Sequence, residues 1–259
     1  MPPWITRLKP RGRRVGWVGI GVLGFVAFLW AAEPSASLQL IVLPLHYQDL
    51  RAFGADVEAL TDALRHASPF HELSDGRISW ELLAPLADEA TALVPVNGTP
   101  PLAIRLDVIK RLDAAHPAPY KLVVLDATGR RSCAELSELS RRSVIILGSH
   151  GFRTSTLLGR GFLHELGHAL GLRDECVRCA ATGDAGFPNC ARTRAEAEAW
   201  WGSLVGVEPR VDFFSGCAGR KDYVRPTMAS LMNDPAHAGD FGAVNERYLR
   251  QAFGAAPAK

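Results

Sequence analysis

The 259-residue sequence has no internal repeats, no second domain boundary and no excess of positive charge in its main part. From Ser37 onward there are 24 Lys and Arg against 26 Asp and Glu, a formal charge of −2. The overall charge of +2 comes from five basic residues that precede residue 15, so the sequence gives no support to nucleic-acid binding by the main domain. With 47% hydrophobic and 22% charged residues, the composition predicts a globular rather than a disordered chain.

Acidic residues are missing from residues 1–14, and charges of either sign are missing from Val15–Ala32. An uncharged run of 18 residues after a basic cluster is typical of a membrane helix whose N-terminus faces the cytoplasm. We therefore expect a cytoplasmic tail (1–14), a membrane anchor (15–32), a linker (33–37) and a main domain (38–259). The alternative is a signal peptide cleaved near the small residues Ser35–Ser37, which would give a secreted protein. Either route places the domain outside the cytoplasm, in the periplasm or at the cell surface.

Cysteines are few, and all five follow the hydrophobic segment. Cys176, Cys179, Cys190 and Cys217 cluster in one stretch, but their spacing does not match a zinc site made of paired CxxC motifs. Disulfides persist outside the cytoplasm, so we expect two bridges among these four, with the pairing left open and Cys133 left over. A second, structural zinc ion is the alternative.

Hydrophobic patterns predict alternating strands and helices in the first half of the domain, which indicates an α/β layer. The expected strands are 38–47, 77–83, 120–127 and 143–149, and the expected helices are 56–70, 102–116 and 154–170. Residues 171–225 are rich in Gly, Cys and Asp and show little periodicity, apart from one short helix at 192–204. A last helix is expected at 242–253.

The stretch "FLHELGHALGLRDEC", residues 162–176, contains two histidines four residues apart. On a helix, His164 and His168 lie on one face, and Glu165 can reach a water molecule beside a metal that they hold. Gly171 can end the helix in a left-handed conformation, so that Asp174 can return to the metal as a third ligand. The alternatives are a surface helix with solvated histidines and a loop role for Asp174, with Glu175 as a rival ligand in the wrong register.

The stretch "HELGHALGLRD" resembles the extended zinc signature of the metzincins in its aspartate-ligand version. "YVRPTMASLM", "FGAVNERYL" and the upstream "LRHASPFHEL" and "YKLVVLDATG" resemble the IgA-peptidase-like zinc metallopeptidases. The resemblance covers most of residues 38–253. It implies a mixed α+β or α/β domain with a mixed β-sheet, a zinc-binding active-site helix and a methionine turn. It also implies one catalytic Zn²⁺ held by His164, His168 and Asp174, with Glu165 as catalytic acid/base and Met232 as the turn methionine.

The sequence departs from this family pattern at two places. Cys176 stands where members often carry an aromatic residue, and no tyrosine follows Met232. Tyr223 is near in sequence, but a packed tyrosine of a strand or loop is the better interpretation. No residue is therefore assigned to stabilise the oxyanion of the transition state.

Together these features predict an extracytoplasmic, membrane-anchored zinc endopeptidase that acts on polypeptides. Zinc would activate a water molecule, and Glu165 would act as the general base. One alternative is another zinc amide hydrolase that acts on the cell wall. The other is a catalytically silent surface binding module that retains a metal, although a pure binding site has no need of Glu165.

Overall fold

The structure is a computed structural model that describes residues 37–73, 76–86, 88, 92–96, 99–177 and 185–254. The expected membrane anchor at 15–32 lies outside these residues. Within the described ranges, no helix combines the length and the apolar character that crossing a membrane requires.

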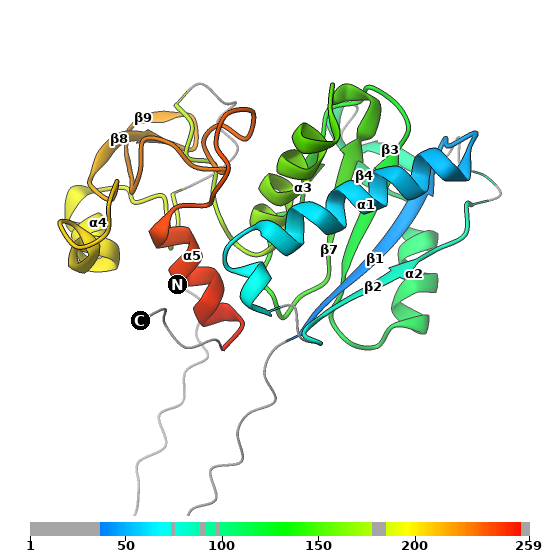
Figure 1. Cartoon of the computed structure of the whole chain (residues 1–259), viewed down its shortest axis with the longest axis horizontal. Helices are drawn as coiled ribbons and strands as arrows, with labels where there is room; N and C mark the ends of the chain where they lie inside the picture. The colour runs from blue at the N-terminus through cyan, green and yellow to red at the C-terminus, as the bar shows by residue number, and fades with distance from the viewer. Residues whose placement is uncertain are drawn as a thin grey trace, which may run out of the picture. The chain divides into compact units, whose positions relative to one another are not determined.

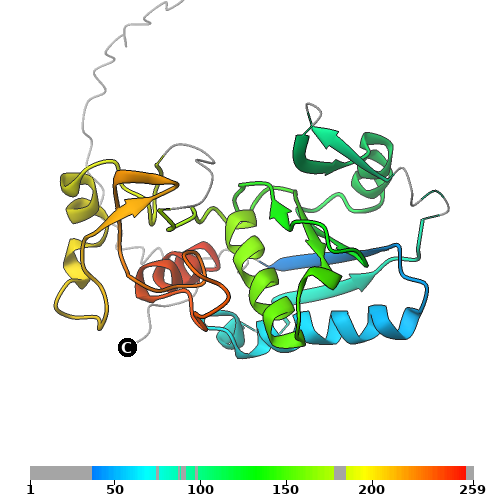
Figure 2. The ribbon, with the colours of Figure 1, turned by 90° about the horizontal axis from the view of Figure 1, so that it is seen from above.

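A five-stranded sheet in the order β2-β1-β5-β7-β6 forms the centre of the first half (Figures 1 and 2). The first four strands are parallel, and only β6 runs antiparallel, against β7. Strands β1, β5 and β7 are buried along almost their whole length, as expected for parallel strands covered on both faces. Their bounds are β1 Leu38–Leu45, β2 Ile78–Leu82, β5 Lys121–Asp126, β6 Cys133–Ala134 and β7 Ser143–Gly148.

Side chains alternate across the sheet, so each strand contributes to two separate cores. Leu40 and Val42 pack with the helices α1 (Leu50–His66) and α3 (Ser155–Ala169). Ile41 and Leu43 pack on the opposite face with α2 (Leu106–Ala115). The sequence thus predicted the α/β layer correctly, and α3 lies against the sheet and is buried or half-buried from Leu158 to its end.

Local signals explain where the helices begin. The Asp49 side chain accepts a hydrogen bond from the backbone N–H of Arg51 and caps α1, and the Thr154 hydroxyl accepts one from Leu157 and caps α3. Helices α1 and α3 approach closely at Gly159, where a Cβ atom would lie only 2.7 Å from the Cβ of Ala63. This contact fixes α3 beside α1.

Two of the predicted helix ranges were wrong. The helix expected at 56–70 begins six residues earlier, after the Asp49 cap, and ends at His66. The helix expected at 102–116 begins only at Leu106, whose side chain is 66% exposed, because residues Thr99–Ile104 form strand β4. Strand β4 pairs antiparallel with β3 (Leu93–Val96), a hairpin that the hydrophobic pattern did not reveal.

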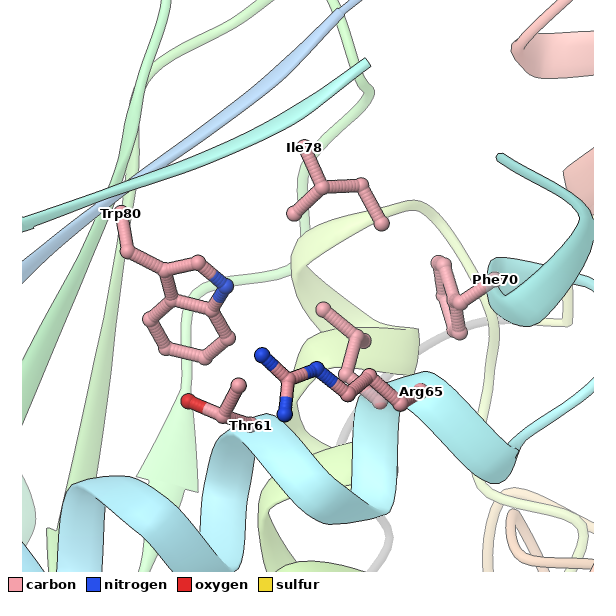
Figure 3. A pocket seen from close by; sticks show the side chains of 6 residues that line it. Thr61, Arg65, Phe70, Ile78 and Trp80 are labelled. Atoms are coloured by element: carbon pink, nitrogen blue, oxygen red, sulfur yellow. The ribbon is translucent and has the colours of Figure 1, made fainter. Parts of the chain in front are cut away.

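A pocket lies between α1 and the edge strand β2, where Arg65 extends toward Thr61 and Trp80 (Figure 3). It is completed by Leu64, Phe70 and Ile78. None of the candidate histidines, carboxylates or cysteines lines this pocket, so it is not the predicted metal site.

The second half carries little regular structure, as the sequence predicted, although it contains one hairpin that the sequence did not indicate. Its elements are α4 Arg194–Trp201, β8 Phe214–Cys217, β9 Arg220–Arg225 and α5 Ala243–Ala252. Short 3-10 helices complete the chain: η1 Phe70–Leu73, η3 Ser149–Gly151 and η4 Gly202–Leu204. The chain is thus a mixed α/β protein whose main sheet is predominantly parallel.

Candidate metal centre

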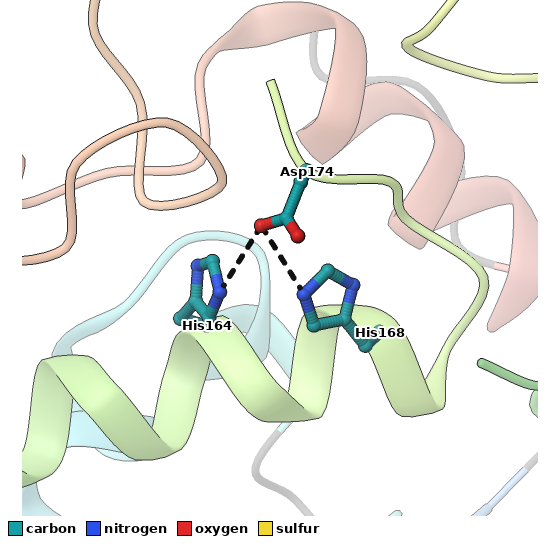
Figure 4. A group of neighbouring side chains, drawn as sticks. All are labelled: His164, His168 and Asp174. Carbon is teal, nitrogen blue, oxygen red and sulfur yellow. Dashed lines mark ion pairs between the residues drawn. The ribbon is translucent and has the colours of Figure 1, made fainter. Parts of the chain in front are cut away.

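The side chains of His164, His168 and Asp174 meet at one point beside α3 (Figure 4). One carboxylate oxygen of Asp174 lies 3.4 Å from the Nε2 atom of each histidine. The three ligand atoms all lie within 4.8 Å of one another. In the part of the chain that the structure describes, no other group of three His, Cys, Asp or Glu side chains comes together in this way.

The spacing and the chemistry of this group fit a zinc ion. Zinc binds His nitrogen and carboxylate oxygen at about 2.0–2.2 Å, and a tetrahedral arrangement then separates the ligand atoms by about 3.3–3.6 Å. The two N–O distances of 3.4 Å fall in this range. Two imidazoles and one carboxylate are also a ligand set that catalytic zinc uses, with a fourth position left for water or substrate.

Backbone carbonyls fix the orientation of both histidine rings. The Nδ1 atom of His164 lies 2.8 Å from the carbonyl oxygen of Leu231, and that of His168 lies 2.9 Å from the carbonyl oxygen of Leu172. A carbonyl can only accept, so Nδ1 must donate its hydrogen in each case. In the neutral ring, Nε2 is then the atom with a free lone pair, and it faces Asp174.

The electrostatics of the site favour a positive charge between the ligands. Burial, with His168 nearby, lowers the pKa of His164 to about 4, so this ring is neutral near pH 7. Burial opposes protonation of His168 as well, but the adjacent Asp174 carboxylate outweighs it and raises the pKa of His168. The Asp174 carboxylate therefore favours a positive charge beside His168, as a bound cation would supply.

Glu165 follows His164 on the helix and is 7% exposed. Burial raises the pKa of its carboxyl group to about 7, with Asp174 adding to this and His168 and Arg131 opposing it. A carboxyl group that titrates near neutral pH can both accept and release a proton, which is the property that general acid–base catalysis needs.

The chain turns back at Gly171 so that Asp174 faces the histidines. Gly171 has a φ of +102°, and its N–H donates to the carbonyl of His168, while the N–H of Leu172 donates to the carbonyl of Gly167. A Cβ atom at Gly171 would also lie 2.6 Å from the hydroxyl oxygen of Tyr248. Both the conformation and the space at this turn therefore require glycine.

Met232 is fully buried and packs against α3 at Gly167, which lies between the two histidines in the sequence. A Cβ atom at Gly167 would lie 2.5 Å from its sulfur, which shows how closely the methionine approaches the helix. The preceding residue, Leu231, supplies the carbonyl that holds His164. The segment around Met232 thus packs against the helix that carries the ligands.

The remaining candidates, Glu175 and Tyr223, make other contacts. Glu175 is fully buried, and its side chain hydrogen-bonds to Asn189, Ser230 and Asn245 rather than to the histidines. Tyr223 lies in β9 and packs on the cysteine pair, as its interpretation as a packed tyrosine anticipated.

The cysteines follow the predicted pattern where the structure describes them. A disulfide joins Cys190 to Cys217, and Cys176 is also disulfide-bonded. Cys179 lies outside the described residues. Cys133 lies partly buried in β6, apart from the cysteine cluster.

Sequence reasoning missed the groups that hold the ligands in place. The carbonyls of Leu172 and Leu231 carry no signal in the sequence because every residue has a carbonyl group. Asn189, Ser230 and Asn245 are common surface residue types, and only their burial marks them.

No protein-family model and no curated protein matches this chain. Among solved structures, the chain is similar to archaemetzincin from Methanopyrus kandleri, with 11% sequence identity and a TM-score of 0.34. The match covers 59% of this chain and 86% of the archaemetzincin chain. A likeness at this level carries no argument about fold or activity, so any function has to be supported by the geometry of the site.

Proposed function

We propose that the chain is a zinc-dependent peptidase in which His164, His168 and Asp174 hold one catalytic Zn²⁺. The observation that carries this proposal is the position of Asp174, whose carboxylate oxygen lies 3.4 Å from both Nε2 atoms. Both rings are locked with Nδ1 as the donor, so all three groups present lone pairs to one point.

A zinc ion bound at this point supplies Lewis acidity, which polarises a substrate carbonyl and makes a water molecule more acidic. The Glu165 carboxylate takes a proton from the attacking water, and the water oxygen forms the new bond to the carbonyl carbon. Glu165 then releases that proton to the leaving amine as the C–N bond breaks. Burial, which raises the pKa of the Glu165 carboxyl group, favours the uptake of this proton.

In this proposal Met232 is the turn methionine beneath the site. Its packing on Gly167 supports this role, as does the carbonyl of its neighbour Leu231, which holds His164. The proposed substrates are polypeptides. The proposed mechanism uses a glutamate as general base and forms no covalent intermediate with the enzyme.

We also propose that the domain works outside the cytoplasm, tethered by the apolar segment 15–32. The Cys190–Cys217 disulfide supports this placement, because disulfides persist in oxidising compartments and are rare in the cytosol. The N-terminal basic cluster supports the orientation with the tail inside.

The decisive experiment replaces Glu165 with glutamine, which keeps the size of the side chain but removes the proton acceptor. Zinc content would be measured by elemental mass spectrometry. Turnover would be measured with a peptide library and, in parallel, with purified cell-wall material. We expect one zinc ion per chain in both parent and variant, and a loss of peptide turnover of about 10²- to 10⁴-fold in the variant. Glu58→Gln, the same chemical change at an exposed position of α1, is the control and should keep parental turnover.

Each alternative gives a different result. Loss of zinc in Glu165→Gln would make Glu165 a ligand and would remove the role assigned to Asp174. Unchanged turnover in that variant would place the activity elsewhere. Cleavage of cell-wall material but not of peptides would favour the cell-wall amide hydrolase, and zinc binding with no turnover of either substrate would favour the binding module.

A further inference from the structure

The third ligand is carried by a segment without regular secondary structure, residues 172–176. No helix or sheet ladder fixes this segment, so contacts from elsewhere in the chain must place Asp174. Asp174 faces the histidines (Figure 4), whereas the side chain of the next residue, Glu175, hydrogen-bonds to other buried groups.

The Glu175 carboxylate is fully buried and accepts hydrogen bonds from three separate segments. The side-chain amides of Asn189 and Asn245 donate to one oxygen at 2.9 and 2.8 Å. The hydroxyl of Ser230 donates to the other oxygen at 2.6 Å. Asn245 lies on α5, Asn189 lies next to Cys190 of the disulfide, and Ser230 lies two residues before Met232.

Backbone hydrogen bonds on either side of Asp174 complete this connection. The N–H of Glu175 donates to the carbonyl of Met232 at 2.8 Å, and the carbonyl of Asp174 accepts from Ala218 at 2.8 Å. The Asn189 side chain also bridges both backbone groups of Arg173, accepting at 3.0 Å and donating at 2.9 Å. The residues before and after Asp174 are therefore both held.

Glu175 is also connected to a second ligand through the methionine segment. Ser230 precedes Leu231, and the Leu231 carbonyl is the group that orients His164. One buried carboxylate thus connects the loop that carries Asp174 to the turn that holds His164. Removing it would leave one N–H group of each asparagine side chain and the buried hydroxyl of Ser230 without this acceptor, which is costly inside a protein.

We propose that Glu175 is the positioning residue of the metal centre, and this inference rests on the proposed zinc site. Its carboxylate does not touch the metal. It holds Asp174 and the Leu231 carbonyl at the separation that places the ligand atoms of Asp174 and His164 around one ion.

The test compares Glu175→Leu with Glu175→Gln in the full chain. Leucine removes all acceptors. Glutamine keeps one oxygen for the two asparagine amides, and its NH₂ group can donate to Ser230, whose hydroxyl can rotate to accept. Leu112→Ala is the matched control, because Leu112 belongs to α2 and is buried on the other face of the sheet, so its loss destabilises the protein without touching the site.

Zinc affinity would be measured by competition with a chelator, and site geometry by the visible absorption spectrum of the Co²⁺-substituted protein. For Glu175→Leu we expect zinc affinity to fall about 10- to 100-fold, the usual effect of losing an outer partner of a metal ligand, with a changed Co²⁺ spectrum. Glu175→Gln should stay close to the parent in both measurements. Leu112→Ala should unfold at lower denaturant concentration but keep parental affinity and spectrum.

Parental affinity and an unchanged Co²⁺ spectrum in Glu175→Leu would overturn the inference. An equal loss of affinity in Leu112→Ala would do the same, because the effect would then be general destabilisation. If Glu175→Leu does not fold, Ser230→Ala is tested instead, because it removes a single donor. We expect this variant to bind zinc more weakly than the parent. Parental zinc affinity in Ser230→Ala would refute the role of Glu175. A parent protein that binds no zinc would instead overturn the proposed function itself.

Discussion

Replacing Gly167 with alanine tests how closely Met232 packs against the helix that carries both histidines. A Cβ atom built at Gly167 lies 2.5 Å from the Met232 sulfur, 3.3 Å from its terminal methyl and 3.2 Å from the ring of Phe241. Non-bonded carbon atoms prefer separations of about 3.5–4.0 Å, so the sulfur has to move by about 1 Å. Met232 and Phe241 are both fully buried, which leaves little room for that movement.

Two opposing terms set the size of the effect. Alanine is better than glycine inside a helix by about 0.5–1 kcal/mol. Overpacking a filled core costs about 1–3 kcal/mol. We therefore expect Gly167→Ala to lower the free energy of unfolding of the zinc-free protein by about 1–2 kcal/mol, and to weaken zinc binding because Leu231 moves with Met232.

Gly54 in α1 provides the matched control, because a Cβ atom built there has nothing within 4 Å. Gly54→Ala should raise the free energy of unfolding by the helix term alone. Both variants would be compared by urea unfolding in the presence of a chelator. If Gly167→Ala is stabilised as much as Gly54→Ala, Met232 does not pack where the structure places it. In a Met232→Ala background, adding Gly167→Ala should cost less free energy of unfolding than it does in the parent, since the new methyl group then has space.

Three further predictions concern the ligand set, the disulfide and the membrane segment. Asp174→Ala should lose zinc affinity as well as activity, and parental zinc affinity in this variant would place the third ligand elsewhere. Met232→Leu nearly conserves the volume of the side chain and should keep zinc and most of the activity. Replacing Cys190 and Cys217 with serine should lower the free energy of unfolding by about 3–4 kcal/mol, given the 27-residue separation, and an unchanged urea midpoint would show that the bridge adds nothing. The mature protein should stay in the membrane fraction, and a soluble form that begins near residue 37 would instead show a cleaved signal.

The sequence predicted the elements whose pattern is local. The buried strands β1, β5 and β7 have runs of Leu, Val and Ile, and α3 has a Thr cap and a terminal glycine, so each appears in a short window. The start of α1 was missed because it depends on the Asp49 cap. The start of α2 was misplaced because Leu102 belongs to the β3–β4 hairpin, whose pairing partner is not visible in the helical pattern.

The same difference between local and distant contacts applies to the residues of the site. His164, His168 and Asp174 could be found from the sequence because all three lie within eleven residues, and helix geometry plus one glycine turn relates them. The partners of Glu175 could not, since Asn189, Ser230 and Asn245 are 14, 55 and 70 residues away. Such contacts exist only once the second half has folded, and nothing in a single sequence pairs them.

The ligands come from two parts of the chain, so metal affinity is coupled to the folding of the second half. Two ligands lie on α3, which packs against both α1 and the sheet. The third ligand, Asp174, is held by Ala218, Met232 and the Glu175 cluster, all from the second half. A metal ion bridging the two sets binds the docked arrangement and not the separated one, so its binding free energy adds to the stability of that arrangement. At a free metal concentration 1,000 times the Kd, this contribution is about 4 kcal/mol, a large part of the 5–15 kcal/mol by which a typical domain is stable.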